Sequence, residues 1–420
     1  MTLTIKRCGK HNLFFMAFTF FLLFSPPILG IHSLFFVAGF SWIYILCNIG
    51  LFFQTIDSRN FVHIFLCLLL LSMWAALLVY LNDGTRAALY HYIYWIVSIF
   101  PGSITLSLHA RKYNEDLGYI LNLILWAAFI QSLISIAAFV NNDFKMLLIN
   151  ELQSDDTLVT TTYVYEIYYR LFGYSAGLTF DMPSAMSMIA CIAIYLGINK
   201  DLKYLFFVPT IVFSAMINAR TSVVVLAIGV FVLLTMNRRV TAKRIERLML
   251  ILLLLVGGIL VGISMLRDIS PLTFRWVSSG LEQLLEFFKG NTNSGYFEYL
   301  VHKNRWRLPS GIFFLFGTGS RVIGGSKYGV FSDVGYINDL WFGGLFYTIT
   351  LYSLVIALIW KVYIRYGKKN KNGVIRFICI TYLLCLPILN IKTFIVAMGA
   401  FTTIFIIVSM HCYIFKNELE

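Results

Sequence analysis

Residues 61–81, FVHIFLCLLLLSMWAALLVYL, decide the class of this protein. The run contains no Asp, Glu, Lys or Arg, and it is long enough to cross a bilayer, which takes about 20 apolar residues in a helix. Similar runs recur along all 420 residues, of which 59% are apolar and 13% charged. Soluble domains are roughly 45–50% apolar and 25% charged. The composition therefore excludes a soluble enzyme and predicts an all-α polytopic membrane protein.

Outward from this run, the apolar segments divide the chain into about twelve transmembrane helices joined by short connections. Few residues remain for a soluble part, so we expect residues 1–420 to form a single membrane domain. The predicted spans are 13–31, 33–53, 61–81, 88–108, 119–140, 180–198, 204–219, 221–236, 248–266, 341–362, 377–391 and 393–415.

The distribution of basic residues predicts the orientation of these spans. If the chain starts inside, the inner connections hold most of the 33 Lys and Arg residues, including the clusters within 238–247 and 361–376. Short cytoplasmic connections of membrane proteins are enriched in Lys and Arg. We therefore expect both termini to be cytoplasmic, and we attribute the basic net charge to topology and not to nucleic-acid binding.

Two outer connections are too long to be turns, namely residues 141–179 and 267–340. Loops of this size in a compact protein are usually functional or disordered, and the aromatic and apolar content of these two favours order. Within the second loop, Leu281, Leu284, Leu285 and Phe288 recur at helical spacing. This pattern predicts a short amphipathic helix, which either lies at the membrane surface or packs on the bundle.

Arg220 lies between the predicted spans 204–219 and 221–236 and is the only charged residue from 204 to 236. Ionisable residues near the hydrocarbon are costly and tend to face a bundle interior or a watery cavity. A guanidinium can bind phosphate oxygens through two parallel hydrogen bonds. We interpret Arg220 as an anion-binding residue, and the alternative is an interfacial arginine that extends its charge to water.

Tyrosines surround Arg170 in the segment TTYVYEIYYRLFGYSAGLTF, with Tyr169 immediately before it. Tyrosine offers a flat apolar face and a hydroxyl group, which suits stacking on sugars, although the same composition describes an ordinary aromatic belt. Gly173 would let the backbone approach an anion closely. Asp181 and the proline two residues later mark a helix start whose amide groups are a second candidate for phosphate binding.

The second long loop is rich in glycine and carries charged residues that we expect to lie over the membrane surface. Its Gly317-Thr318-Gly319 is not a nucleotide loop, because Val322 replaces the third glycine of the pattern. Asp333 is the best candidate for a general base, although each charge, taken singly, is typical of a solvated loop. The charged residues are His302, Arg305, Arg307, Arg321, Asp333 and Asp339.

No metal site is predicted. Asp155 and Asp156 have no further ligands nearby and fit an exposed loop tip. The seven cysteines fall in spans or on the inner side, and none pairs with a histidine at zinc-ligand spacing.

The order of these features resembles that of the Wzy-type O-antigen polymerases and the O-antigen ligases. Three stretches carry the resemblance, together with Asn390-Ile391-Lys392 between the last two spans. They are Arg170-Leu171-Phe172-Gly173 with Asp181-Met182-Pro183, then Ala219-Arg220-Thr221-Ser222, and then Ser332-Asp333-Val334-Gly335-Tyr336 followed by Gly343-Gly344. The ligases carry a His-Asn pair about eleven residues before the first of these glycines, where this chain has Ser332 and Asp333. The resemblance therefore favours a polymerase over a ligase.

The resemblance implies a fold similar to the GT-C membrane glycosyltransferases, in the bacterial inner membrane. It implies polymerisation of undecaprenyl-diphosphate-linked oligosaccharide repeat units at the periplasmic face, which would leave both long loops periplasmic. Because the donor carries its own diphosphate leaving group, no cofactor is expected. The partners would be the lipid-linked donor and acceptor, membrane lipid and a chain-length regulator protein, with no nucleic acid.

The same resemblance suggests roles for individual residues. Arg170 and Arg220 would stabilise the leaving diphosphate, and Asp333 would accept the proton of the acceptor hydroxyl. Substrate binding would involve Arg305, Arg321, Tyr169, Tyr336 and Lys392. A non-enzymatic flippase of lipid-linked glycans is the alternative class, but we would expect it to line its central helices with charges.

Overall fold

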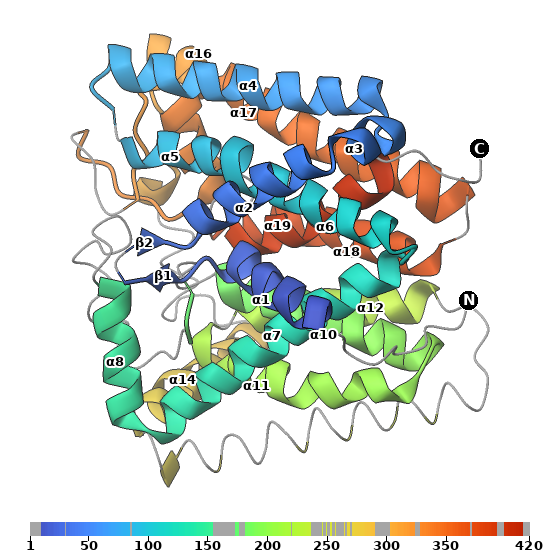
Figure 1. Ribbon diagram of the computed structural model, residues 1–420. Coiled ribbons are helices and arrows are strands. Elements are labelled where there is room, and N and C mark those ends of the chain that lie inside the picture. Colours follow the sequence, from blue (N-terminus) through green and yellow to red (C-terminus); the bar gives the residue numbers. More distant parts are fainter. Residues whose placement is uncertain are drawn as a thin grey trace.

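The computed structural model describes residues 10–29, 31–84, 86–153, 173–175, 181–219, 221–236, 271–289, 303–323, 328–369, 372–392 and 399–414, together with single positions between 246 and 268. These residues form a bundle of helices that run back and forth between two ends (Figure 1). The elements of the first half are α1 (Lys10–Phe24), β1 (Pro27–Ile28), β2 (Ile31–His32), α2 (Leu34–Cys47), α3 (Ile49–Thr55), α4 (Ser58–Leu81), α5 (Arg86–Tyr94), η1 (Trp95–Ile99), α6 (Phe100–Lys112), α7 (Leu117–Val140) and α8 (Asn142–Gln153). The second half contains α10 (Asp181–Asn199), η3 (Leu202–Phe207), α11 (Val208–Asn218), α12 (Thr221–Met236), α14 (Pro271–Phe288), η4 (Lys303–Trp306), α16 (Ile312–Phe316), α17 (Gly335–Val362), η5 (Tyr363–Lys369), α18 (Gly373–Leu389), α19 (Gly399–Ser409) and η7 (Met410–Ile414).

Among the described residues, five helices are long and apolar enough to cross a membrane, or six if the bent pair α2 and α3 counts as one span. The five are Ser58–Leu81, Leu89–Lys112, Leu117–Val140, Asp181–Asn199 and Gly335–Lys369. The protein is therefore an all-α membrane protein. Most of the predicted span 248–266 lies outside the described residues.

The predicted span 33–53 is bent, because α2 ends at Cys47 and α3 continues at an angle of 81°. Asn48 lies at the bend, with φ −118° and ψ 30°. Its side-chain Nδ2 donates to the Tyr44 carbonyl at 2.8 Å, and its Oδ1 accepts from Lys112 Nζ at 3.0 Å. Such side-chain bonds compete with the helical backbone pattern. The helix therefore turns at Asn48.

α17 begins at Gly335, six residues before the start of the predicted span 341–362. Gly344 interrupts this helix with φ 75° and ψ −175°. Just before the break, the carbonyls of Trp341 and Phe342 accept from the amides of Thr318 at 2.7 Å and Gly319 at 2.9 Å, which fixes the preceding segment against α17.

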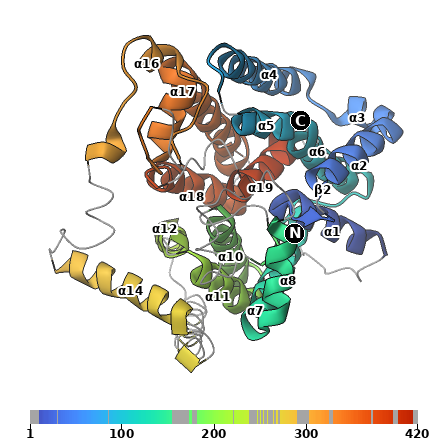
Figure 2. The same ribbon diagram turned by 90° about the vertical axis from the view of Figure 1, so that its left-hand side faces the viewer.

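The core surrounds α10, whose residues Met182–Ile198 are all buried. It packs on α11, α12, α18, α19 and α7, and Figure 2 shows it near the middle of the lower half of the bundle. Small residues such as Ala185, Ala193 and Gly197 allow this close helix packing, as is usual in membrane proteins. α14 covers the predicted amphipathic helix and lies to one side of the bundle (Figure 2).

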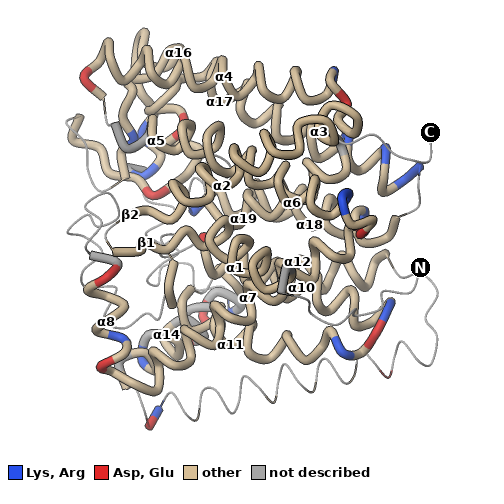
Figure 3. The backbone as a smooth tube through the Cα atoms, viewed as in Figure 1, with Lys and Arg blue, Asp and Glu red and all other residues tan. Residues whose placement is uncertain are grey.

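The charged residues gather toward the two ends of the bundle and leave its middle largely apolar (Figure 3). One end is joined by polar contacts between Lys112 and Asn48, and between Arg365 and Asp57 at 3.8 Å. The other end holds β1 and β2, α8 and the segment before α17. The candidate site lies at this second end.

Candidate functional site

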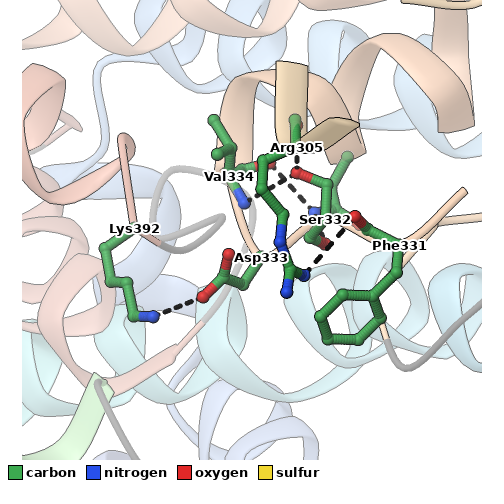
Figure 4. Close-up of polar contacts among 7 residues, drawn as sticks. Arg305, Phe331, Ser332, Asp333, Val334 and Lys392 are labelled. Atoms are coloured by element: carbon green, nitrogen blue, oxygen red, sulfur yellow. Dashed lines mark hydrogen bonds and ion pairs between the residues drawn. The ribbon is translucent and has the colours of Figure 1, made fainter. Parts of the chain in front are cut away.

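Asp333 and Lys392 form an ion pair at the end of the bundle (Figure 4). Asp333 precedes α17, and Lys392 follows α18. Both side chains are largely removed from water, with 12% of the Asp333 side chain and 14% of the Lys392 side chain exposed. The backbone supports the pair, because the amide of Gly335 donates to the carbonyl of Asn390 at 2.8 Å. An ion pair thus links two of the predicted site residues.

The two carboxylate oxygens of Asp333 differ in their surroundings. Oδ2 accepts from Lys392, whereas no described residue donates a hydrogen bond to the buried Oδ1. A buried acceptor without a donor is costly, by about 1–3 kcal/mol. Oδ1 is therefore the oxygen of this carboxylate with an unused capacity to accept a hydrogen bond.

Arg305 lies beside this carboxylate in the view of Figure 4. Its guanidinium donates to the Phe331 carbonyl at 3.5 Å and lies 4.2 Å from the centroid of the Phe331 ring. Its own carbonyl accepts from Ser332 Oγ at 2.6 Å. η4 is therefore tied to the residues that immediately precede Asp333. Arg305 itself is only partly buried.

A second polar cluster lies deeper, within α17 and α18. Asp339 Oδ2 accepts from the hydroxyl of Tyr352 at 2.8 Å, and that hydroxyl in turn accepts from the side chain of Asn390. Tyr336 stacks on Tyr352 with ring centroids 5.5 Å apart. Asp339 Oδ1 and Asn390 Oδ1 are buried without a hydrogen-bond partner among the described residues, so this network is only partly satisfied.

Arg321 faces the same cluster, with its guanidinium Nε and Nη2 atoms buried. Burial lowers the pKa of Arg321, and the negative charge of Asp339 opposes that shift. The guanidinium also lies 5.6 Å from the centroid of the Phe342 ring. Arg321 and Asp339 thus influence each other electrostatically inside the protein, and the role of Arg321 in substrate binding stays a prediction.

The expectation of solvated charges on a surface loop is thus wrong for Asp333 and Asp339. Asp333, taken as a whole residue, is 8% exposed, and Asp339 is fully buried within α17. The physical reason is that the backbone of the segment before α17 lies very close to the backbone of α4. A side chain at Gly319 would meet the Leu78 carbonyl at 2.5 Å, so only a glycine there lets this segment pack against the end of α4.

Three predicted site residues, Arg170, Tyr169 and Arg220, lie outside the described residues, as do His302, Asp155 and Asp156. Among the tyrosines around Arg170, Tyr174 is described, and its hydroxyl donates to the Pro27 carbonyl. Asp181 accepts from the amides of Ala400 at 2.6 Å and Phe401 at 3.1 Å. It therefore caps the start of α19.

Two polar residues at the site, Asn338 and Tyr352, were missed by the sequence analysis. A usable signal existed, because polar side chains inside a membrane-spanning segment often mark a functional site. Asn338 escaped notice because residues up to 340 were assigned to the loop. Tyr352 did not stand out because tyrosine is common throughout this chain.

Replacing Lys392 by Met is expected to destabilise the protein, because it leaves the Asp333 carboxylate buried without its cation. Removing one partner of a buried ion pair costs about 3–5 kcal/mol. Thermal unfolding of the purified protein in detergent measures the effect. The double variant Asp333→Asn with Lys392→Met should recover much of the lost stability, since no unpaired charge remains. An unchanged melting temperature for Lys392→Met alone would contradict the ion pair.

Comparisons with protein-family models, curated proteins and solved structures found no match to this chain. Within the described parts of the chain, no group of three or more His, Cys, Asp or Glu side chains is arranged to hold a metal ion. The functional assignment therefore depends on the site and on the order of the motifs.

Proposed function

We propose that this protein is a membrane glycosyltransferase that polymerises undecaprenyl-diphosphate-linked oligosaccharide repeat units into a surface polysaccharide. The observation that carries the proposal is the Asp333 carboxylate, which is paired with Lys392 and whose Oδ1 has no hydrogen-bond donor among the described residues. The arrangement fits a general base, and the order of the motifs around it resembles that of the O-antigen polymerases. In this proposal the chain has about twelve spans and a fold related to the GT-C glycosyltransferases.

The proposed reaction requires one proton transfer and one displacement. The acceptor hydroxyl gives its proton to Asp333, and its oxygen forms the new glycosidic bond to the anomeric carbon of the donor. The bond from that carbon to the diphosphate oxygen breaks, so negative charge gathers on the leaving group. Arg305, Arg170 and Arg220 are the cations that we propose to stabilise this charge.

The proposal includes an orientation in the bacterial inner membrane. The end that carries Asp333 faces the periplasm, where lipid-linked repeat units are joined, and both termini lie in the cytoplasm. The supporting observation is the concentration of Lys and Arg at the opposite end, at the ends of α6 and α17 and in η5. Basic residues at short connections favour the cytoplasmic side.

The experiment that tests the function is the polysaccharide ladder of a deletion strain. Loss of a polymerase leaves single repeat units attached to the lipid core, and the wild-type gene restores the ladder. Loss of a ligase leaves polymer on undecaprenyl diphosphate and none on the core. Loss of a flippase leaves no repeat units outside the inner membrane. A normal ladder in the deletion strain would refute the proposal.

Replacing Arg220 by Ala is expected to abolish or strongly reduce polymerisation while the protein stays in the membrane, because the cation for the diphosphate is lost. Arg220→Lys should restore only part of the activity, since lysine keeps the charge but cannot bind two oxygens through a planar fork. Ladder length, normalised to membrane abundance, measures both variants. Full activity of Arg220→Ala would remove this residue from the site.

A further inference from the structure

Asn338 makes four side-chain hydrogen bonds to the backbone around the candidate base. Its Oδ1 accepts from the amides of Val322 at 3.0 Å and Ile323 at 2.9 Å. Its Nδ2 donates to the carbonyls of Ser332 at 2.8 Å and Val334 at 2.9 Å. Asn338 is fully buried in the first turns of α17. These bonds use both donors and both acceptor positions of one carboxamide group.

The four partners lie on two segments of the chain, one on each side of the site. Ser332 and Val334 flank Asp333, and Val322 and Ile323 follow Arg321 directly. A backbone hydrogen bond from the amide of Ser332 to the Val322 carbonyl, at 3.2 Å, joins the same two segments. The carboxamide therefore determines where the backbone on either side of Asp333 lies relative to α17.

No other side chain of similar size can make these bonds. An aspartate at this position keeps the acceptors but turns a negative oxygen toward the carbonyls of Ser332 and Val334. An alanine removes all four bonds. The Val334 carbonyl keeps the bond from the backbone amide of residue 338 at 3.0 Å, but the other three backbone groups lose their side-chain partner, and a buried group without a partner costs about 1–3 kcal/mol. The surrounding apolar cluster of Val322, Val330, Val334, Ile337 and Trp341 offers no replacement donor or acceptor.

We infer that Asn338 is a positioning residue, which places the Asp333 carboxylate for proton transfer without touching the substrate itself. This inference rests on the proposed function, because it assigns the proton transfer to Asp333. A misplacement of about 1 Å can reduce a catalysed rate about 10²-fold. Loss of the carboxamide should therefore lower kcat and leave KM for the lipid-linked repeat units little changed.

The test combines kinetics with a double-mutant cycle on the full-length protein in proteoliposomes, with synthetic undecaprenyl-diphosphate-linked repeat units as substrate. Asn338→Ala should reduce kcat by about 10²-fold. If Asn338 acts through Asp333, the effects of Asn338→Ala and Asp333→Asn on kcat will not add. A misplaced base already contributes little to the rate, so its removal then lowers kcat only slightly. Asn372→Ala is the control, since Asn372 also bonds two backbone amides, those of Val374 and Ile375, at the start of α18. Additive effects would overturn the positioning role.

Hydrogen exchange of the same proteins separates this inference from the function. In Asn338→Ala, the amides of residues 318–323 and 328–334 should lose protection, while those of 373–389 keep it. Unchanged protection overturns the inference whether or not the protein polymerises glycans. A wild-type protein without polymerase activity would refute the proposed function alone, and the exchange data would still decide whether Asn338 holds the segment. If Asn338→Ala cannot be purified, Asn338→Asp replaces it in the exchange experiment. Because Asn338→Asp keeps two of the four bonds, the same amides should lose less protection.

Discussion

Replacing Asp333 by Asn is expected to reduce long polysaccharide chains to one or a few repeat units. Asparagine keeps the shape of the side chain, but it cannot accept the proton of the acceptor hydroxyl. General-base assistance is worth about 10²–10⁴-fold in rate, so chain extension should nearly stop. The ladder of the complemented deletion strain, compared at equal membrane abundance, gives the readout.

The control for this variant is Asp201→Asn at the opposite end of the bundle. Asp201 also pairs with a lysine, Lys203, at 2.9 Å, in a more exposed position, so the substitution removes an Asp–Lys ion pair away from the site. Its ladder should stay normal. Asp333→Asn should still bind the lipid-linked donor and acceptor, and failed binding would indicate that the residue only anchors the segment. A normal ladder for Asp333→Asn would move the search to Asp339 and Asp181.

Replacing Gly344 by Ala is expected to cause a large loss of stability. Its backbone conformation, φ 75° and ψ −175°, belongs to a region that is essentially restricted to glycine. An added Cβ would lie 2.3 Å from the Leu315 carbonyl oxygen and 2.5 Å from the Gly317 amide nitrogen. The strain and the clash together should cost on the order of 3–5 kcal/mol, measured as a lower melting temperature in detergent.

Gly39→Ala provides the matched control for that variant. Gly39 lies within α2, and a Cβ there would have no neighbour within 4 Å. Alanine is favoured over glycine in a helix by roughly 1 kcal/mol, so this substitution should leave the melting temperature unchanged or raise it. Equal melting temperatures for Gly344→Ala and the wild type would show that the break in α17 does not exist.

The apolar spans were the part of the fold that the sequence predicted best. The segments 61–81 and 119–140 correspond closely to α4 and α7, because a long apolar run in lipid has to satisfy its backbone as a helix. The bend at Asn48 was not predicted, since it depends on Lys112, which is distant in sequence and contributes the second bond. Periodicity carries no information about such a partner.

Some features of the candidate site could likewise be predicted from the sequence, whereas others depend on contacts between distant residues. The sequence by itself determined that this is a helical membrane protein, and it singled out Asp333 and Lys392 as candidate residues. Only the tertiary structure decided that the two form an ion pair, that Asp339 is buried beside Tyr352, and that Asn338 holds the backbone around the base. Composition reports how much of a chain prefers lipid, whereas a contact between distant residues depends on how helices pack and where a glycine such as Gly344 lets the backbone break.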